Sequence, residues 1–278
     1  MKTIYTLLLL CSCAALSAQD PFKLAVGSKA IEFREIDHLT VVGGSGSELV
    51  VEGRSAREQT DPRADGLRKI SASGLRDNTG FGLSVTESEG RILVQQVGGE
   101  GKAVTVRVPN SASVRVEQST YRGGDLEVRD FSGALDVSMM YHEVELSNVT
   151  GPQAVNAVYG DITAVWNAPP TEEARLHSTY SSVDVTLPAA AKVDVRLSTG
   201  YGEMFTDFDM QMKANTAPEV KAEPRPRVRV YSSDDGGSYT YDYRGGGERK
   251  SGLTGTINGG GPLLALTATY KNIYLRKK

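Results

Sequence analysis

Cysteine is nearly absent from this chain of 278 residues, which contains only two. Both of them, Cys11 and Cys13, lie close to the N-terminus, so the remainder of the chain uses no disulfide to stabilise its fold. Histidine is also scarce. His38, His142 and His177 are far apart in the sequence and have no partner at a ligand spacing, so no metal site is expected.

An excess of one charge sign is missing too. The chain carries 31 Lys and Arg against 34 Asp and Glu, which gives a formal net charge of -3. Such a balance creates no broad field for a polyanion, so we expect no nucleic-acid partner. No nucleophile motif is present, and the glycine run 259–261 lacks the Lys-Ser/Thr that a phosphate loop needs. We therefore expect no cofactor and no enzymatic activity.

Long hydrophobic runs are confined to the N-terminus. Lys2 precedes an apolar stretch at residues 4–10, and small residues follow up to Ala18. This is the pattern of a secretory signal peptide, and the stretch is too short to be counted as a membrane span. We predict cleavage after Ala18. The protein is then exported, to the periplasm, the outer-membrane surface or the extracellular space.

A lipoprotein signal is the alternative interpretation of the same segment. Ser12 is a small residue directly before Cys13, and an acyl chain on Cys13 would anchor the protein to a membrane. A membrane partner is expected only in that case.

Sustained apolar periodicity of 3.6 residues is also lacking, so we expect little or no helix. What the chain has instead is strict alternation. Val104, Val106 and Val108 fall on one face of a strand while Thr105 and Arg107 fall on the other. Successive side chains of a strand point to opposite faces, so such strands bury one face and expose the other. The sequence therefore predicts an all-β fold.

One short motif recurs through the second half of the chain. It consists of a tyrosine, two further residues and an apolar residue that restarts a strand. Successive copies from Tyr141 to Tyr201 are 18 to 21 residues apart, and Tyr121 begins a looser copy. A fixed period near 20 residues predicts a single-stranded β-solenoid whose coils stack at about 4.8 Å. An antiparallel meander is the alternative.

The tyrosines have the parity of the buried residues before them, so we expect them to end strands on the core-facing side and to stack as a structural corner ladder. The alternative is an exposed ladder, which could stack on sugars or bind protein partners. The ladder comprises Tyr141, Tyr159, Tyr180, Tyr201 and Tyr270. A second corner has the form Asn/Asp, apolar, Ser/Thr, Gly. We expect structural turn glycines there and in the C-terminal glycine run, at Gly133, Gly151, Gly259, Gly260 and Gly261.

The repeat divides the chain into five parts. Residues 1–18 are the signal peptide, and 19–103 form an N-terminal β region continuous with the solenoid. Regular repeats occupy 104–208. Residues 209–250, which contain the proline-rich stretch Gln211 to Arg227, are a loop-rich insertion. Residues 251–278 are the C-terminal closing strands.

Three features resemble a known family: the turn 148–151, the serial Tyr/Gly-x-x-apolar strand starts, and the ending in which the glycine-rich stretch 255–261 precedes 267–277. The chain is similar to the adhesins proposed for bacterial envelopes, β-strand-repeat proteins of unknown function related to the head domain of autotransporter adhesins. The resemblance implies a secreted, mostly parallel β-solenoid with an adhesin-like role. A protein or glycan of the cell surface is the implied partner. The signal peptide resembles those of Bacteroidota-type Gram-negative bacteria.

Two alternatives to a non-catalytic adhesin or scaffold remain. A carbohydrate-active enzyme on a β-helix would need outward carboxylates that converge with Arg or Lys. The candidates for that role are Asp125, Glu127, Glu143, Glu145, Asp161 and Asp184. The other alternative is a periplasmic partner of an envelope-sensing regulator. We expect a partner to meet the charged strand faces or the stretch Gln211 to Arg227.

Overall fold

The computed structural model describes residues 20–53, 63, 74–98, 103–212 and 251–278. These residues form two large β-sheets without an α-helix, so the all-β prediction is confirmed. Within them, no helix is long and apolar enough to cross a membrane. The predicted signal peptide with Cys11 and Cys13, and most of the predicted insertion 209–250, lie outside the described residues.

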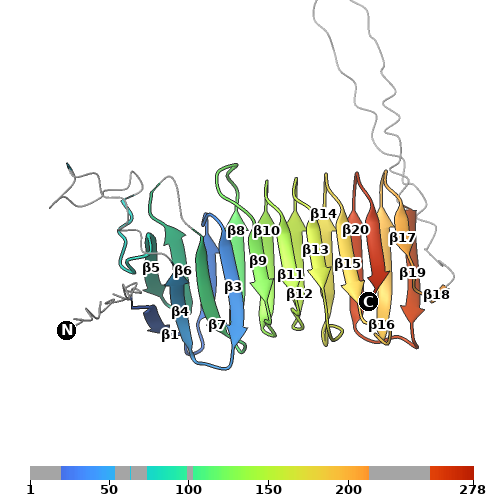
Figure 1. The fold of residues 1–278 in the computed structure, drawn as a ribbon, viewed down its shortest axis with the longest axis horizontal. Coiled ribbons are helices and arrows are strands. Elements are labelled where there is room, and N and C mark those ends of the chain that lie inside the picture. Colours follow the sequence, from blue (N-terminus) through green and yellow to red (C-terminus); the bar gives the residue numbers. More distant parts are fainter. Residues whose placement is uncertain (1–19, 54–62, 64–73, 99–102, 213–250) are drawn as a thin grey trace, which may run out of the picture.

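The strands lie side by side along the long axis of an elongated molecule (Figure 1). One sheet has ten strands, in the order β1 (Phe22–Ala25), β4 (Glu48–Gly53), β7 (Val104–Pro109), β3 (Leu39–Gly44), β9 (Leu126–Arg129), β11 (Val144–Ser147), β13 (Ile162–Val165), β15 (Val183–Leu187), β21 (Ile273–Lys277) and β17 (Met204–Thr206). We call it sheet A.

The other sheet, sheet B, has eleven strands. Their order is β18 (Met210–Met212), β19 (Ser251–Ile257), β16 (Val193–Thr199), β20 (Leu263–Ala268), β14 (Ala174–Ser178), β12 (Gln153–Ala157), β10 (Ala134–Met139), β8 (Ser113–Gln118), β2 (Ala30–Arg34), β6 (Arg91–Gln96) and β5 (Leu83–Ser88).

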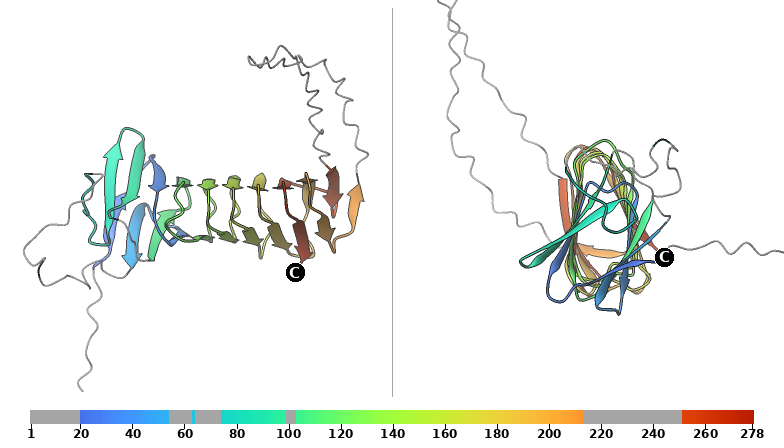
Figure 2. Two further views of the ribbon diagram at one scale, coloured as in Figure 1. Left: turned by 90° about the horizontal axis from the view of Figure 1, so that it is seen from above. Right: turned by 90° about the vertical axis from the view of Figure 1, so that its left-hand side faces the viewer.

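Through the middle of the molecule, consecutive strands alternate between the two sheets. In sheet B, β10 pairs in parallel with β12, and β12 pairs in parallel with β14. In sheet A, β11 pairs in parallel with β13, and β13 with β15. The chain therefore passes from one sheet to the other and back, advancing by one strand each time. We call one such pair of strands a coil. Figure 2 shows the two sheets facing each other across a flattened interior.

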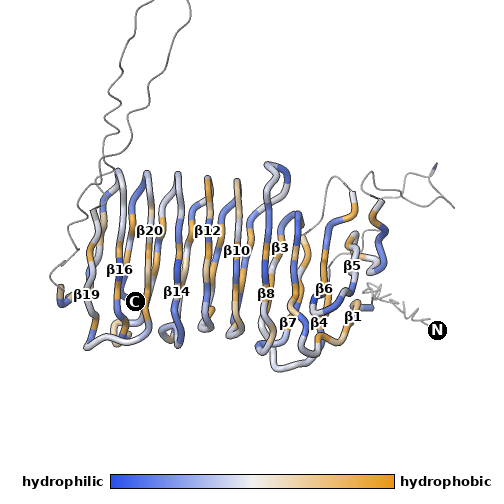
Figure 3. The backbone as a smooth tube through the Cα atoms, turned by 180° about the vertical axis from the view of Figure 1, so that it is seen from behind, coloured by the Kyte–Doolittle hydropathy of each residue, from blue (hydrophilic) through white to orange (hydrophobic). Residues whose placement is uncertain are grey.

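The core fills the space between the sheets, because the register keeps inward residues of neighbouring strands level. Val137, Val155 and Leu176 are consecutive partners across sheet B, and each is buried. Burying one such side chain stabilises the fold by about 1.5–3 kcal/mol relative to leaving it exposed. Hydrophobic and hydrophilic residues alternate along the strands in Figure 3, as the sequence pattern predicts.

The sheets are mixed, and their strand order departs from the chain order, so the predicted single-stranded solenoid is not what the structure shows. Antiparallel pairs occur toward both ends, such as β1 with β4 and β16 with β19. In addition, β2 and β3 lie between the coils β6–β7 and β8–β9. A repeat period cannot reveal these changes, because it says nothing about which copy stacks on which.

The C-terminal strands are the clearest case. β20 lies between β14 and β16, and β21 lies between β15 and β17, in parallel with both neighbours. This coil thus fills an interior row instead of closing the stack: β21 is one strand from the end of sheet A, and β20 is three strands from the end of sheet B. Arg276 fixes it to β15 by three hydrogen bonds of 2.8–3.1 Å to the Asp184 carboxylate.

Candidate binding surface

Five corners of the stack share one construction. Each strand of sheet B ends two residues before a tyrosine, and the next strand of sheet A begins three residues after it. At Tyr159, for example, β12 ends at Ala157 and β13 begins at Ile162. The apolar residue three positions after the tyrosine therefore restarts a strand, as the motif predicts. The corner itself has four residues in every copy.

The five tyrosine rings form one continuous stack, which we call the tyrosine ladder. Ring centroids of Tyr141 and Tyr159 are 5.3 Å apart, and those of Tyr159 and Tyr180 are 4.9 Å apart. Tyr270 follows at 4.9 Å from Tyr180, and Tyr201 at 4.9 Å from Tyr270. The rings are parallel within 1–12°. The C-terminal coil thus places Tyr270 inside the ladder, ahead of Tyr201.

The tyrosines face outward, so the prediction that they face the core is wrong. Between 43% and 66% of each residue's surface is exposed. Parity fails here because the regular strand has already ended. Each tyrosine lies within the bend, where side chains no longer alternate between two faces. The ladder is therefore an aromatic strip on the surface of the molecule.

Main-chain hydrogen bonds hold the ladder in register. The Tyr159 N–H donates to the Met140 carbonyl at 2.9 Å, and the Tyr180 N–H donates to the Val158 carbonyl at 2.8 Å. The N–H groups of Tyr270 and Tyr201 are bonded in the same way, at 3.0 and 2.9 Å. Because the backbone fixes each ring's attachment point, the spacing of the rings follows the spacing of the strands.

A row of polar acceptors runs beside the ladder, two residues after each tyrosine. The Asp161 Oδ1 accepts from the Ser182 N–H at 2.7 Å, and the Asn272 Oδ1 accepts from the Glu203 N–H at 3.0 Å. At the irregular corner, the Asp125 Oδ1 accepts from the Glu143 N–H at 3.0 Å. Sequence reasoning missed this row, although a residue with a side-chain oxygen follows each of the five tyrosines at this spacing.

The N-terminal half of this row is acidic. Partial burial raises the pKa of Glu143, and the nearby carboxylates of Asp125, Asp161 and Glu145 raise it further. Like charges on neighbouring strands therefore disfavour ionisation. A surface with this charge repels anionic ligands and accepts hydroxyl groups.

Two glycines allow the corners to stack this closely. A Cβ atom on Gly160 would lie 1.9 Å from the His142 carbonyl oxygen, and one on Gly202 would lie 1.8 Å from the Lys271 carbonyl oxygen. Neither glycine has a positive φ. Close approach of neighbouring coils, and not a special backbone angle, is what requires glycine here.

The predicted turn glycines lie at the opposite corner of the coils and in one connection. Gly133 and Gly151 are at the opposite corner, where a Cβ would approach a neighbouring carbonyl oxygen within 2.1 and 2.3 Å. Gly259, Gly260 and Gly261 connect β19 to β20, and the first two have φ of 91° and 83°.

Tyr121 lies off the ladder. Its corner, residues 119–125, is three residues longer than the regular corner, and Tyr121 is 72% exposed. Among the residues that the structure describes, no aromatic ring stacks on Tyr121; the Arg122 guanidinium lies 5.9 Å from its centroid. The chain thus offers one exposed tyrosine of the same motif that does not join the ladder.

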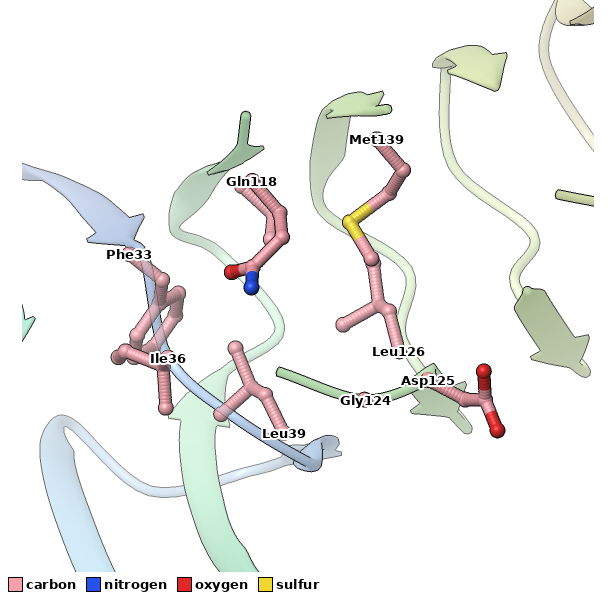
Figure 4. Close-up of a pocket in the computed structure, with 9 residues that line it drawn as sticks. Phe33, Ile36, Leu39, Gln118, Gly124, Asp125, Leu126 and Met139 are labelled. Carbon is pink, nitrogen blue, oxygen red and sulfur yellow. The ribbon is translucent and has the colours of Figure 1, made fainter. Parts of the chain in front are cut away.

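The cavities among the described residues give little support to a catalytic site. The space in Figure 4, between Phe33, Gln118 and Met139, is only about 10 Å³, the size of a water molecule. A shallow depression of about 400 Å³ on sheet B contains Asp136, Glu173 and Arg175. Arg175 pairs with Glu173 at 2.7 Å, and Arg115 lies 3.9 Å from Asp136. Its carboxylates are therefore engaged by arginines.

A third hollow, of about 600 Å³, lies at the C-terminal end between Met204, Met210 and Leu253. It is mainly apolar and contains Glu203 as its single acidic residue. Across the part of the chain that the structure describes, no three His, Cys, Asp or Glu residues are grouped so that they could hold a metal ion.

Comparison with known proteins gives little. No family model matches the chain, and no curated protein matches it. One solved structure, "a putative cell adhesion protein" from Clostridium sporogenes, aligns with 93% of this chain and 99% of its own length. The identity is 8% and the TM-score is 0.40, a likeness too distant to carry an argument about function.

Proposed function

We propose that the protein is an exported, non-catalytic, adhesin-like binding protein of the bacterial envelope, built on a β-solenoid scaffold. The tyrosine ladder is its binding surface. The single observation that carries the proposal is the exposure of five stacked rings along one edge. A contiguous apolar strip held open to solvent is typical of an interaction site, and tyrosine is enriched at such sites.

The scaffold supports this role. Parallel pairing on both sides of the middle strands fixes the ladder along about 20 Å of the molecule, so a partner meets preformed surface and needs to order few side chains. The protein or glycan partner proposed here is one of the cell surface. The resemblance of the sequence to envelope adhesins agrees with this proposal.

The carbohydrate-active enzyme has less support. Catalytic carboxylates of a glycosidase face each other across a bound sugar. Here Asp184 is engaged by Arg276, Glu173 by Arg175, and Glu127 by Arg129. These three carboxylates are therefore already paired with arginine side chains.

A binding assay with two tyrosine variants tests the proposal. Fluorescently labelled full-length protein is incubated with cells and isolated envelopes of the source organism. We expect the variant with Tyr159, Tyr180 and Tyr270 each changed to Ser to bind at least tenfold more weakly. Tyr121→Ser is the matched control, because it changes an exposed tyrosine of the same motif outside the ladder, and it should bind as the unaltered protein does.

Two results would refute the proposal. One is equal binding by the triple variant and the control, provided that circular dichroism shows both to be folded. The other is release of reducing sugar from envelope polysaccharide that is abolished by changing one outward carboxylate, since that would identify an enzyme.

A further inference from the structure

We propose that the tyrosine ladder binds an extended, uncharged β-1,4-linked polysaccharide laid along it, with one sugar residue for each coil. This inference rests on the proposed function and names the ligand class of the same surface. Three properties of the ladder lead to it: which part of each ring is open, how often the ring recurs, and what charge lies beside it.

The ladder exposes ring edges and hydroxyl groups to a ligand, because the faces of neighbouring tyrosine rings cover one another. At 4.9–5.3 Å between centroids, no ligand ring can enter between two neighbouring tyrosines. Stacking of a sugar on an aromatic face is therefore available only at the two ends. Along its length the ladder presents a row of phenolic O–H groups that both donate and accept hydrogen bonds.

The repeat of this row selects for a ligand with the same period. An extended polypeptide laid along the ladder advances by about 3.3 Å per residue and would drift out of step after one or two rings. The sugars of an extended β-1,4-linked chain advance by nearly the ladder's own repeat. Alternate sugars are turned over, but each one carries hydroxyl groups on both edges, so every tyrosine meets a partner.

The charge beside the ladder sets the ligand's charge. Glu143, Asp161 and Glu203 are exposed two residues after their tyrosines and outnumber the one exposed lysine of these corners, Lys271, so the strip disfavours a polyanionic glycan or a nucleic acid. The same positions suit an uncharged sugar, because a carboxylate that accepts one main-chain N–H retains a second oxygen for a sugar hydroxyl.

Isothermal titration calorimetry of the full-length protein with cellohexaose and maltohexaose tests whether the ligand must match the ring spacing of the ladder. The two hexasaccharides have the same composition and charge, but maltohexaose is α-1,4-linked and coils. We expect cellohexaose to bind at least tenfold more tightly. With β-1,4 glucans of two to six sugars, affinity should rise with each sugar and level off near five, the number of rings. Equal affinity for both hexasaccharides would overturn the proposal.

The variant Tyr180→Phe with Tyr270→Phe tests the hydroxyl row, since it removes two central O–H groups and leaves the stack. We expect at least a fivefold loss of affinity for cellohexaose and an unchanged melting temperature. Tyr121→Phe is the matched control and should change neither. Unchanged binding by the double variant would overturn the assignment to the ladder.

The two proposals fail in different ways. If envelope binding depends on the ladder but cellohexaose neither binds nor competes, the ligand class is wrong and the binding function stands. If sedimentation shows that Tyr180→Phe with Tyr270→Phe dissolves a dimer and leaves glycan binding intact, the ladder joins two copies and the glycan proposal is wrong.

Discussion

Two coils of the molecule lie out of chain order, and the corners that join their two strands differ. β2 with β3, and β20 with β21, each lie between two coils that follow one another in the chain. Both have a corner of four residues, at 35–38 and 269–272. The N-terminal corner has left-handed residues, Glu35 and His38, with φ of 50° and 47°. It places Ile36 in the core, whereas the C-terminal corner places Tyr270 outside.

The difference shows that strand pairing determines the register, whereas the corner residues determine which side chains the edge of the stack exposes. Parallel pairing on both sides admits either coil into the stack, and it does not determine which corner residue points inward. The corner residues then decide whether the edge presents an aromatic ring or closes over the core. The ladder accordingly continues through the C-terminal coil, whereas at the other end it stops at Tyr141, before the longer corner of the coil β8–β9.

Leu266→Ala should break the C-terminal coil and has the largest expected effect. Leu266 is fully buried in β20, level with Leu176 and Leu197 on the strands at either side. Its removal leaves a cavity between three strands, so we expect a loss of about 3 kcal/mol in the free energy of unfolding. Urea denaturation measures it. Thr267→Ala, on the outer side of the same strand, should cost far less; equal costs would argue against an interior position for this coil.

Tyr159→Ala sharpens the comparison at the corner. Tyr159 is half exposed but loses two stacked neighbours when truncated. We expect the free energy of unfolding to fall by about 1–2 kcal/mol, less than for a buried tyrosine. Tyr121→Ala, outside the ladder, should cost below about 0.5 kcal/mol. A loss at Tyr159 no larger than at Tyr121 would mean that stacking adds nothing to stability.

Glu35→Gln probes the N-terminal corner and has the smallest expected effect. The Glu35 carboxylate accepts hydrogen bonds of 2.9 and 2.6 Å from Ser119 and of 3.3 and 2.9 Å from Thr120. Partial burial alone would raise the pKa of Glu35, but these four bonds outweigh it and lower the pKa. Its stabilisation is therefore present above the unfolded pKa of about 4.3 and is lost as pH falls through the depressed folded value.

In the Glu35→Gln variant we expect a loss of less than about 1 kcal/mol at neutral pH, because solvent still reaches this partly buried group and screens its charge. The difference from the unaltered protein should shrink as pH falls through the folded pKa. Urea denaturation across that range checks this. A difference that is independent of pH would show that the carboxylate's charge is not involved.

Local features of the fold could be predicted from the sequence, and long-range order could not. Alternation fixed which residues are buried, and the tyrosine motif marked where strands restart, at positions such as Val144 and Ile273. The local sequence does not show whether Tyr201 or Tyr270 stacks on Tyr180, because both tyrosines follow a strand of the same pattern. Only the pairing of β20 with β14 and β16 decides it.

The outward direction of the tyrosines was hidden for a related reason. Parity describes a strand, and Tyr159 comes after β12 has ended at Ala157. The proposed binding surface thus lies in the bends, where the alternation that locates the core no longer applies. The acceptor row beside it could have been found, since a side-chain oxygen recurs two residues after each tyrosine.

The position of the last coil has a consequence for how the chain is made. Synthesis proceeds from the N-terminus, so β20 and β21 leave the ribosome after β14, β15, β16 and β17, yet they lie between those strands in the two sheets. Until they arrive, β14 and β16 lack their shared neighbour, and Tyr180 and Tyr201 lack the ring between them. A chain that stops before β20 therefore leaves β14 and β16 without the strand between them, and β15 and β17 likewise, so this part of the stack can form only after residues 263–277 have been made.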